Sequence, residues 1–496
     1  MLFRSDLKGA VLASANLRGA NLTGADLQEA VLAGADLTKA IFDEANLDGA
    51  DLSGATLTAV NFGSTSLSNV KFKGVHSGQI TGSPLNLPSG WKIINGYLAG
   101  PSADLTGLTS TNSTDLQGLD LSNANLTNAN ISGSALNGTN LQGATLKGIA
   151  GMNINASSST KLPSGYALKG GQFDSGSQTY TGTNIVGAAV QLNGVSLKGA
   201  DLTGMNLAGA RLSNVDFSGA VLVNASLTGA NVSCTELATA NVLGLKTGGL
   251  TGTPWHIPAG SVTWNGYLVS HLTNLEGADL HGATFNNVDF GNGDLAGVNL
   301  SGVTCTGCSF WFASMNHANI SNMSARFTNF DGVDLTNANV DGAALGFSTF
   351  RPVTTALLPH AHPWTTPIIK TFTYNASLKG ATGALVAGFC NFTNAQLNGA
   401  NLKGGSLNHS TMDGADMQQS DLTNVDGRNA TFVGTNLAGA RLAGAAMDGA
   451  NLQTANLASA SSGPSSTSSF SADGAMLPAG WSVVNGYLID PGKNQH

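Results

Sequence analysis

The chain opens with ten consecutive five-residue units that occupy residues 5–54: SDLKG AVLAS ANLRG ANLTG ADLQE AVLAG ADLTK AIFDE ANLDG ADLSG. The third residue of each unit is Leu or Phe, the first is Ala or Ser, and the second is often Asp or Asn. A period of five matches neither an α-helix, at about 3.6 residues, nor a strand, at about 2. If the first and third residues point inward, three residues are extended and the other two, mostly turn-forming types, make a corner. The pattern predicts a chain that corners once per unit and winds into a coil.

The number of units per coil is indicated by the spacing of large aromatic residues. Phe290, Phe310, Phe330 and Phe350 occupy third positions and are each twenty residues apart. With four units per coil these rings stack in one interior column, where offset aromatic contacts add to burial. A neighbouring column contains Leu280, Leu300, Ile320 and Val340. We therefore expect four units per coil.

These units resemble the pentapeptide repeat family, whose consensus is A(D/N)LxG, over most of the chain. The resemblance implies an all-β fold, a right-handed quadrilateral β-helix in which each coil of the solenoid contains four pentapeptide repeats. It also implies that Leu, Phe and Ala lie inside and that Asp and Asn lie outside. Amide side chains stacked in one outer column, such as Asn299 and Asn319 after Asp279, are then expected to hydrogen-bond along it.

Phase slips divide the chain into five arrays of repeats and five inserts. The arrays are 1–75, 101–150, 184–244, 272–350 and 377–460, and the inserts are 76–100, 151–183, 245–271, 351–376 and 461–496. Four inserts contain related text, which makes the insert a second repeat. The related segments read LPSGWKIINGYL at 87–98, LPSGYALKGGQF at 162–173, IPAGSVTWNGYL at 257–268 and LPAGWSVVNGYL at 477–488.

Each of these four segments contains a turn dipeptide seven residues after its Pro: Asn95-Gly96, Gly170-Gly171, Asn265-Gly266 or Asn485-Gly486. Asn-Gly between short β-prone runs is a strong signal for a two-residue hairpin. We therefore expect four β-hairpins. Because an isolated hairpin is marginal in water, their aromatic side chains should pack on a solenoid flank or an open coil end. These aromatics are Trp91, Tyr97, Trp264, Tyr267, Trp481 and Tyr487.

The insert at 351–376 is Pro-rich and lacks the Asn-Gly turn. The array before it places Phe327 and Phe347 at the outward corner position, and Trp311 and Phe312 also fall at a corner. One interpretation is that the insert folds back and covers the outward rings. The other is that these four residues form an exposed aromatic patch that binds a partner.

Cys305 and Cys308 form a CxxC motif, but both occupy inward positions. We expect core packing, with a metal or redox site as the alternative, because a structural zinc would need two further ligands. Cys390 is also at an inward position and Cys234 at an outward one. This arrangement predicts no disulfide framework.

No catalytic, cofactor-binding or metal site is expected. His360 and His362, in the Pro-rich insert, are interpreted as ordinary loop residues, with metal chelation as the alternative. The outward Asp residues would stand on a solvated wall, whereas catalytic carboxylates need a pocket that perturbs their pKa. We expect these carboxylates to have a structural function.

Composition limits the possible partners. The 496 residues are 10% charged with a net charge of −8, which indicates neither a basic nucleic-acid-binding face nor a dense acidic surface. No apolar run is long enough to span a bilayer. The N-terminus is already in repeat register, without the apolar core of a secretory signal, which favours the cytoplasm.

The sequence therefore predicts a non-enzymatic scaffold with a protein partner or with itself as partner. Repeats begin at residue 2, so an open coil edge is expected there unless something covers it, and open edges template further β-pairing into dimers or filaments. A truncated reading frame is the competing explanation for this uncapped start. One alternative follows from the resemblance: some pentapeptide repeat proteins imitate DNA and bind DNA gyrase, although the charge here is sparse for that function. The other alternative is a cell-surface or envelope component with a neutral, Asn/Thr/Ser-rich exterior.

Overall fold

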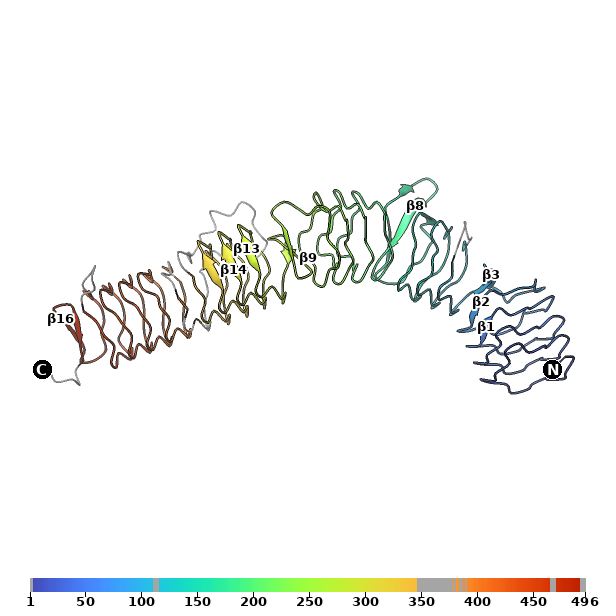
Figure 1. Cartoon of the computed structure of the whole chain (residues 1–496), viewed down its shortest axis with the longest axis horizontal. Helices are drawn as coiled ribbons and strands as arrows, with labels where there is room; N and C mark the ends of the chain where they lie inside the picture. The colour runs from blue at the N-terminus through green and yellow to red at the C-terminus, as the bar shows by residue number, and fades with distance from the viewer. Residues whose placement is uncertain are drawn as a thin grey trace. The chain divides into compact units, whose positions relative to one another are not determined.

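The computed structural model describes residues 3–109, 116–345, 378, 381–382, 387–388, 390–463 and 470–490. The chain forms two compact units, one made of Met1–Asn241 with Leu250–Pro258 and the other of Val242–Gly249 with Ala259–His496. The described residues contain no helix. Each unit is a stack of backbone coils, which Figure 1 shows as successive loops of ribbon.

Backbone pairing fixes the length of a coil. Parallel bridges join outward residues twenty positions apart, such as Asp6 to Asp26 and Asp26 to Asn46. Between the first two coils, the N–H of Leu7 donates to the carbonyl of Asp26 at 2.7 Å, and the N–H of Asp26 donates to the carbonyl of Ser5 at 2.9 Å. A turn follows the third residue of each five-residue unit, so a coil of twenty residues contains four repeats. The predicted β-solenoid with four repeats per coil is confirmed.

The strands that extend beyond single bridges are short. They are β1 (Thr56–Thr58), β2 (His76–Gly78), β3 (Lys92–Ile94), β4 (Tyr97–Ala99), β5 (Ile154–Ser157), β6 (Ala167–Lys169), β7 (Gln172–Asp174), β8 (Thr179–Val186), β9 (Leu245–Lys246), β10 (Val262–Trp264), β11 (Tyr267–Val269), β12 (Thr273–Asn274), β13 (Thr284–Asn286), β14 (Thr304–Thr306), β15 (Ser324–Arg326), β16 (Ser482–Val484) and β17 (Tyr487–Ile489). Strands of neighbouring coils pair in parallel, as in β13–β14–β15. The hairpin strands of the inserts pair antiparallel, and so do β5, β6 and β7 with β8.

The core is the column of first and third positions. The rings of Phe290 and Phe310 stack with centroids 4.6 Å apart, and those of Phe310 and Phe330 with centroids 5.0 Å apart, both pairs within 3° of parallel. The predicted aromatic column is confirmed for these three residues, and Phe350 lies outside the described residues. The neighbouring column, Leu280, Leu300, Ile320 and Val340, is completely buried.

Many corners are hydrogen-bonded turns, beginning with the one at residues 7–10. In the first one, the N–H of Ala10 donates to the carbonyl of Leu7 at 2.9 Å, and Gly9 has φ +65°. A positive φ at the third residue of the turn is what a type II turn requires, which explains the frequent Gly and Asn there. The outward acid holds the same corner, because the N–H of Lys8 donates to Oδ1 of Asp6 at 3.2 Å. Asp and Asn are thus favoured at the second position because they accept from the N–H two residues later.

Three inserts contain a two-residue hairpin. Antiparallel pairs β3–β4, β10–β11 and β16–β17 are joined at Asn95-Gly96, Asn265-Gly266 and Asn485-Gly486. The coil that follows the first hairpin pairs directly with the coil that precedes it, since Asp104 bridges to His76. The repeat ladder of the first unit therefore continues past this insert.

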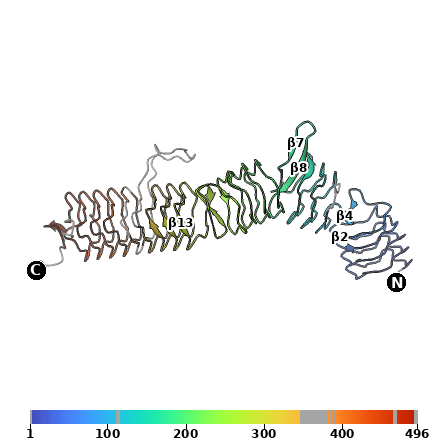
Figure 2. The same cartoon turned by 45° about the horizontal axis from the view of Figure 1, so that its top comes forward.

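The hairpin predicted at Gly170-Gly171 is wrong. Strands β6 and β7 do not pair with each other; both pair with β8, which also pairs with β5. The reversal lies at residues 175–178, where Asp174 accepts from the N–H of Gly176 at 2.9 Å. Strand β8 has eight residues and is long enough to pair with both β6 and β7. Gly170 and Gly171 therefore link two strands that lie one after the other along β8, and they do not form a hairpin turn. Figure 2 shows β7 and β8 projecting from the coils.

Candidate interaction surfaces

The outer wall is a set of polar columns. Nδ2 of Asn299 donates to Oδ1 of Asp279 at 2.9 Å, and Nδ2 of Asn319 donates to Oδ1 of Asn299 at 3.2 Å. The predicted hydrogen bonding along this column is confirmed. The wall is therefore cross-linked from coil to coil by its own side chains.

Several carboxylates on this wall are stabilised in their ionised form. The hydroxyl and N–H of Thr38, with a further contribution from Arg18, lower the pKa of Asp36 to about 2. The hydroxyls of Thr203 and Ser218 lower the pKa of Asp201 and of Asp216 in the same way. A general acid requires the opposite shift. These groups are suited to holding corners.

The aromatic residues proposed as a patch occupy two corners that are three repeats apart in the chain. Trp311 and Phe312 are half-buried and pack edge to face, with ring centroids 4.7 Å apart. The ring of Phe312 lies over Gly332, where an added Cβ would be 3.1 Å away. Phe327, at the corner three repeats later, has 65% of its surface exposed. Phe347 and the insert at 351–376, with His360 and His362, lie outside the described residues.

The hairpin aromatics differ in burial. The ring of Trp91 packs against that of Phe72, with centroids 5.3 Å apart. Tyr97, Tyr267 and Trp481 are half-buried. Trp264 is 37% exposed and Tyr487 is 47% exposed. The first hairpin is thus packed as expected, and the C-terminal hairpin (residues 477–489) presents one of its rings to solvent.

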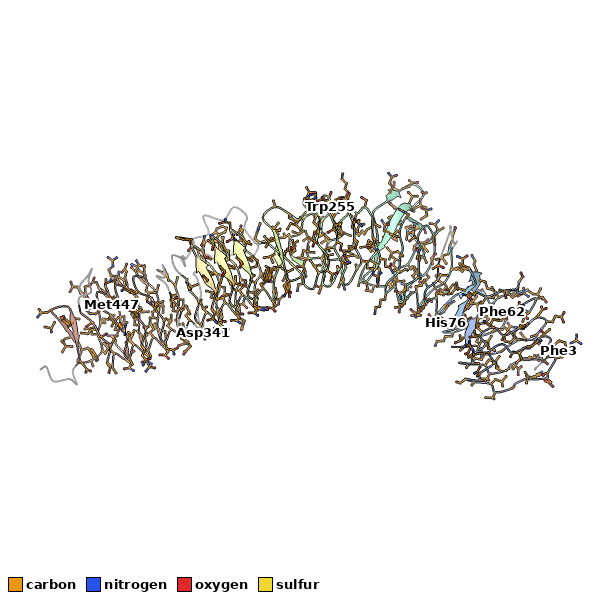
Figure 3. All side chains as sticks on the ribbon, in the orientation of Figure 1. Phe3, Phe62, His76, Trp255, Asp341 and Met447 are labelled. Carbon is orange, nitrogen blue, oxygen red and sulfur yellow. A yellow bond between two sulfur atoms is a disulfide. The ribbon has the colours of Figure 1, made fainter. Side chains whose placement is uncertain are left out.

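Two exposed apolar residues were not expected from the sequence. Leu85 is 68% exposed and Trp255 is 74% exposed, and both belong to the first unit. They follow Pro in the related segments TGSPL and TGTPW. Figure 3 shows the labelled Trp255 side chain at the outside of its coil. The matching segments were the available signal, since apolar residues at equivalent positions of two inserts indicate a shared exposure.

The cysteine prediction is correct in position and wrong in chemistry. Cys305 and Cys308 are buried in the core, but they are joined by a disulfide, with Cα atoms 5.8 Å apart. A disulfide typically spans about 4.4–6.8 Å between Cα atoms. The two residues are the ends of one corner turn and both point inward, so the fold itself brings them to this distance. Neither Cys234, which is exposed, nor Cys390, which is buried, takes part in a disulfide.

Several histidines lie beside carboxylates of the wall. Nδ1 of His76 is 3.0 Å from Oδ2 of Asp104, and Nδ1 of His281 is 3.0 Å from Oδ1 of Asp279. Across the described part of the chain, no group of three or more His, Cys, Asp or Glu could hold a metal ion. In the same part, no helix is long and apolar enough to cross a membrane.

The first coil (residues 3–22) has an open edge. Leu7, Leu12 and Leu17 are only partly buried, whereas their equivalents one coil later, Leu27, Leu32 and Leu37, are completely buried. Phe3, labelled in Figure 3, is 46% exposed, and Val11 is 79% exposed. Apolar surface therefore gathers at this edge.

The model of the pentapeptide repeats family matches the chain in eight copies. The copies cover residues 5–43, 42–74, 112–148, 196–233, 273–302, 304–342, 390–426 and 428–460. Since these segments make up more than half of the sequence, the chain belongs to the pentapeptide repeat family.

Several solved structures are similar to this chain. HetL, a pentapeptide repeat protein involved in heterocyst differentiation regulation from the cyanobacterium Nostoc, is 19% identical over 55% of this chain and 82% of its own, with a TM-score of 0.21. QnrB1, a plasmid-mediated fluoroquinolone resistance protein, is 15% identical over 42% of this chain and 86% of its own, with a TM-score of 0.22. A pentapeptide repeat protein from the thylakoid lumen of Arabidopsis thaliana is 24% identical over 26% of this chain and 66% of its own, with a TM-score of 0.16. Among curated proteins, none matches the sequence significantly.

Proposed function

We propose that this protein is a non-enzymatic scaffold, a right-handed, four-sided β-solenoid that associates end to end. The observation that carries the proposal is the open edge of the first coil. Leu7, Leu12 and Leu17 remain partly exposed there, beside backbone groups whose equivalents one coil later, such as the N–H of Asp26, donate to the preceding coil. Unpaired strand edges with apolar side chains favour pairing with another chain.

The polar wall supports a scaffold rather than an enzyme. Carboxylates of the wall accept hydrogen bonds from the corner two residues on, and such bonds lower the pKa of Asp36 and of Asp201. Such groups hold the backbone and bind the next coil. We infer that the wall keeps the solenoid stiff while the coil ends and the exposed aromatics provide contacts for protein partners.

Sedimentation velocity across a wide micromolar range tests the association. We expect a sedimentation coefficient that rises with concentration. A single monomeric species at every concentration would refute end-to-end association. A gyrase supercoiling assay run beside it tests the DNA-mimicking alternative, and we expect no inhibition because the net charge is only −8 over 496 residues.

An envelope or cell-surface component is a second candidate, favoured by the disulfide between Cys305 and Cys308. Disulfides persist mainly in oxidising compartments and are rare in a reducing cytosol. Fractionation of native cells would decide this point. Recovery with the envelope or medium, with the disulfide intact, supports the candidate, and recovery of the reduced protein with the cytosol contradicts it.

A further inference from the structure

In three inserts, the hairpin packs on the solenoid through the same two contacts, a hydrogen bond and a Gly–Tyr pair, which together we call the joint. A backbone N–H in the hairpin donates to a hydroxyl at the start of the same insert: Leu98 to Ser77 at 2.8 Å, Leu268 to Thr247 at 3.0 Å, and Leu488 to Ser462 at 2.6 Å. The residue after each hydroxyl is a Gly, and the ring of the hairpin Tyr fills the space of its missing side chain. These Gly–Tyr pairs are Gly78 with Tyr97, Gly248 with Tyr267, and Gly463 with Tyr487.

In the first and third inserts, the next coil covers this joint. Oη of Tyr97 donates to the carbonyl of Gly107 at 3.4 Å, and Nδ2 of Asn95 donates to the carbonyl of Thr109 at 3.1 Å. The third insert makes equivalent contacts 170 positions later: Oη of Tyr267 accepts from the N–H of Asp279 at 3.3 Å, and Nδ2 of Asn265 donates to its carbonyl at 3.5 Å. The hairpin therefore forms a surface on which the following coil packs.

The C-terminal hairpin has the same joint without that cover. Among the described residues, no coil follows it; β16 lies beside the last coil in Figure 1. Leu488 and Ile489 are partly exposed, whereas the equivalent Leu98 and Ala99 are completely buried. Val484 is 46% exposed, and its equivalent Ile94 is 7% exposed. The surface that packs against a coil in the first and third inserts is thus exposed in the C-terminal hairpin.

We propose that the C-terminal hairpin receives the first coil of a second copy of this chain. That coil begins Ser5-Asp6-Leu7-Lys8-Gly9, in the pattern of the coils that follow the two internal hairpins, Ala103-Asp104-Leu105-Thr106-Gly107 and Thr273-Asn274-Leu275-Glu276-Gly277. Its leucines are partly exposed, as a covering coil requires.

Backbone polarity selects a head-to-tail contact. After the first hairpin, the N–H of Asp104 donates to the carbonyl of Val75 at 2.9 Å, and the carbonyl of Ser102 accepts from Gly74 at the same distance. Ala460 and Ser459 occupy the positions of Val75 and Gly74, and Asp6 occupies that of Asp104. Two hairpins facing each other cannot reproduce this ladder. A head-to-tail contact joins two different surfaces, so it adds one copy after another into filaments, or into rings where the rotation closes.

Two end variants test this proposal, which rests on the proposed self-association. Tyr487→Asp blocks the hairpin and Leu7→Asp blocks the first coil. We expect each variant alone to sediment as a monomer, and an equimolar mixture to form a heterodimer through its one intact pair of ends. Lys198→Asp, which alters an exposed polar residue in the interior of the sequence, should associate like the parent. Val484→Lys provides a second hairpin variant if thermal unfolding shows that Tyr487→Asp is misfolded.

The remaining outcomes separate the two proposals. If the parent chain is monomeric at every concentration, both end-to-end association and the hairpin contact are refuted. If the parent associates and both variants associate equally well, only the hairpin contact is refuted. Dimerisation of Leu7→Asp alone would indicate a hairpin-to-hairpin contact, and dimerisation of Tyr487→Asp alone would indicate a coil-to-coil contact; either result overturns the head-to-tail proposal.

Discussion

At the scale of single residues, the repeat pattern shows which side chains point inward, but not what the outward ones do. Burial of Phe310 follows from its place in the period. The hydrogen bonds from Thr38 to Asp36 do not follow from it, because they depend on the direction of an N–H and a hydroxyl two residues after the acid. The candidate wall was therefore predictable in position, and its structural function only in outline.

Asp36 should make stability depend on acid pH. Its folded pKa of about 2 is below the usual unfolded value of about 3.9. A lowered folded pKa contributes stability that is present above the unfolded pKa and is lost as the pH falls towards the folded one. Between about pH 4 and pH 2, we expect Asp36→Asn to lose less stability than the parent in denaturant titrations at stepped pH. Parallel losses would show that Asp36 does not contribute.

Phe310 should be among the most costly core residues to truncate, because its ring is stacked on both sides. We expect Phe310→Ala to lower the free energy of unfolding of the second unit by about 3–5 kcal/mol. The matched control Met476→Ala removes a side chain that is 46% exposed, and surface changes of this kind usually stay within about 0.5 kcal/mol. Chemical denaturation measures both, and equal losses would contradict the stacked column.

At the scale of elements, a turn dipeptide predicts a hairpin correctly only where no other strand of the chain pairs with the two flanking strands. Asn95-Gly96 joins two short strands that have no other antiparallel partner among the described residues, and its hairpin forms. Gly170-Gly171 has the same spacing, but β8 pairs with the strands on both sides of it. Competition from a strand that lies later in the chain cannot be read from a dipeptide.

The corner between Cys305 and Cys308 shows the same limit and allows a direct check. With one thiol exposed, one buried and two in a disulfide, the native protein should take up one maleimide, at Cys234. Unfolding without reductant should raise the uptake to two, and unfolding with reductant to four, the total number of cysteines. Intact mass spectrometry counts the labels. Four labels in the unreduced, unfolded protein would exclude the disulfide.

At the scale of the whole molecule, the sequence predicts the coil because every coil repeats the same arrangement. The spacing of Phe290, Phe310 and Phe330 indicated four repeats per coil, and the stacked rings agree. The division into two compact units at Asn241 could not be predicted, since the repeats on either side have the same pattern. The exposure of the C-terminal hairpin could not be predicted either, because its sequence matches that of the covered hairpins.

Cross-linking of outward positions tests the twenty-residue coil most directly. Asp416 and Asn436 are bridge partners in neighbouring coils, and paired strands lie about 4.8 Å apart, within disulfide range. In a Cys234→Ser background, we predict that Asp416→Cys with Asn436→Cys forms a disulfide under mild oxidation. Asp416→Cys with Asp426→Cys, half a coil apart, should keep both thiols free. A disulfide in the second pair and none in the first would contradict a coil of four repeats.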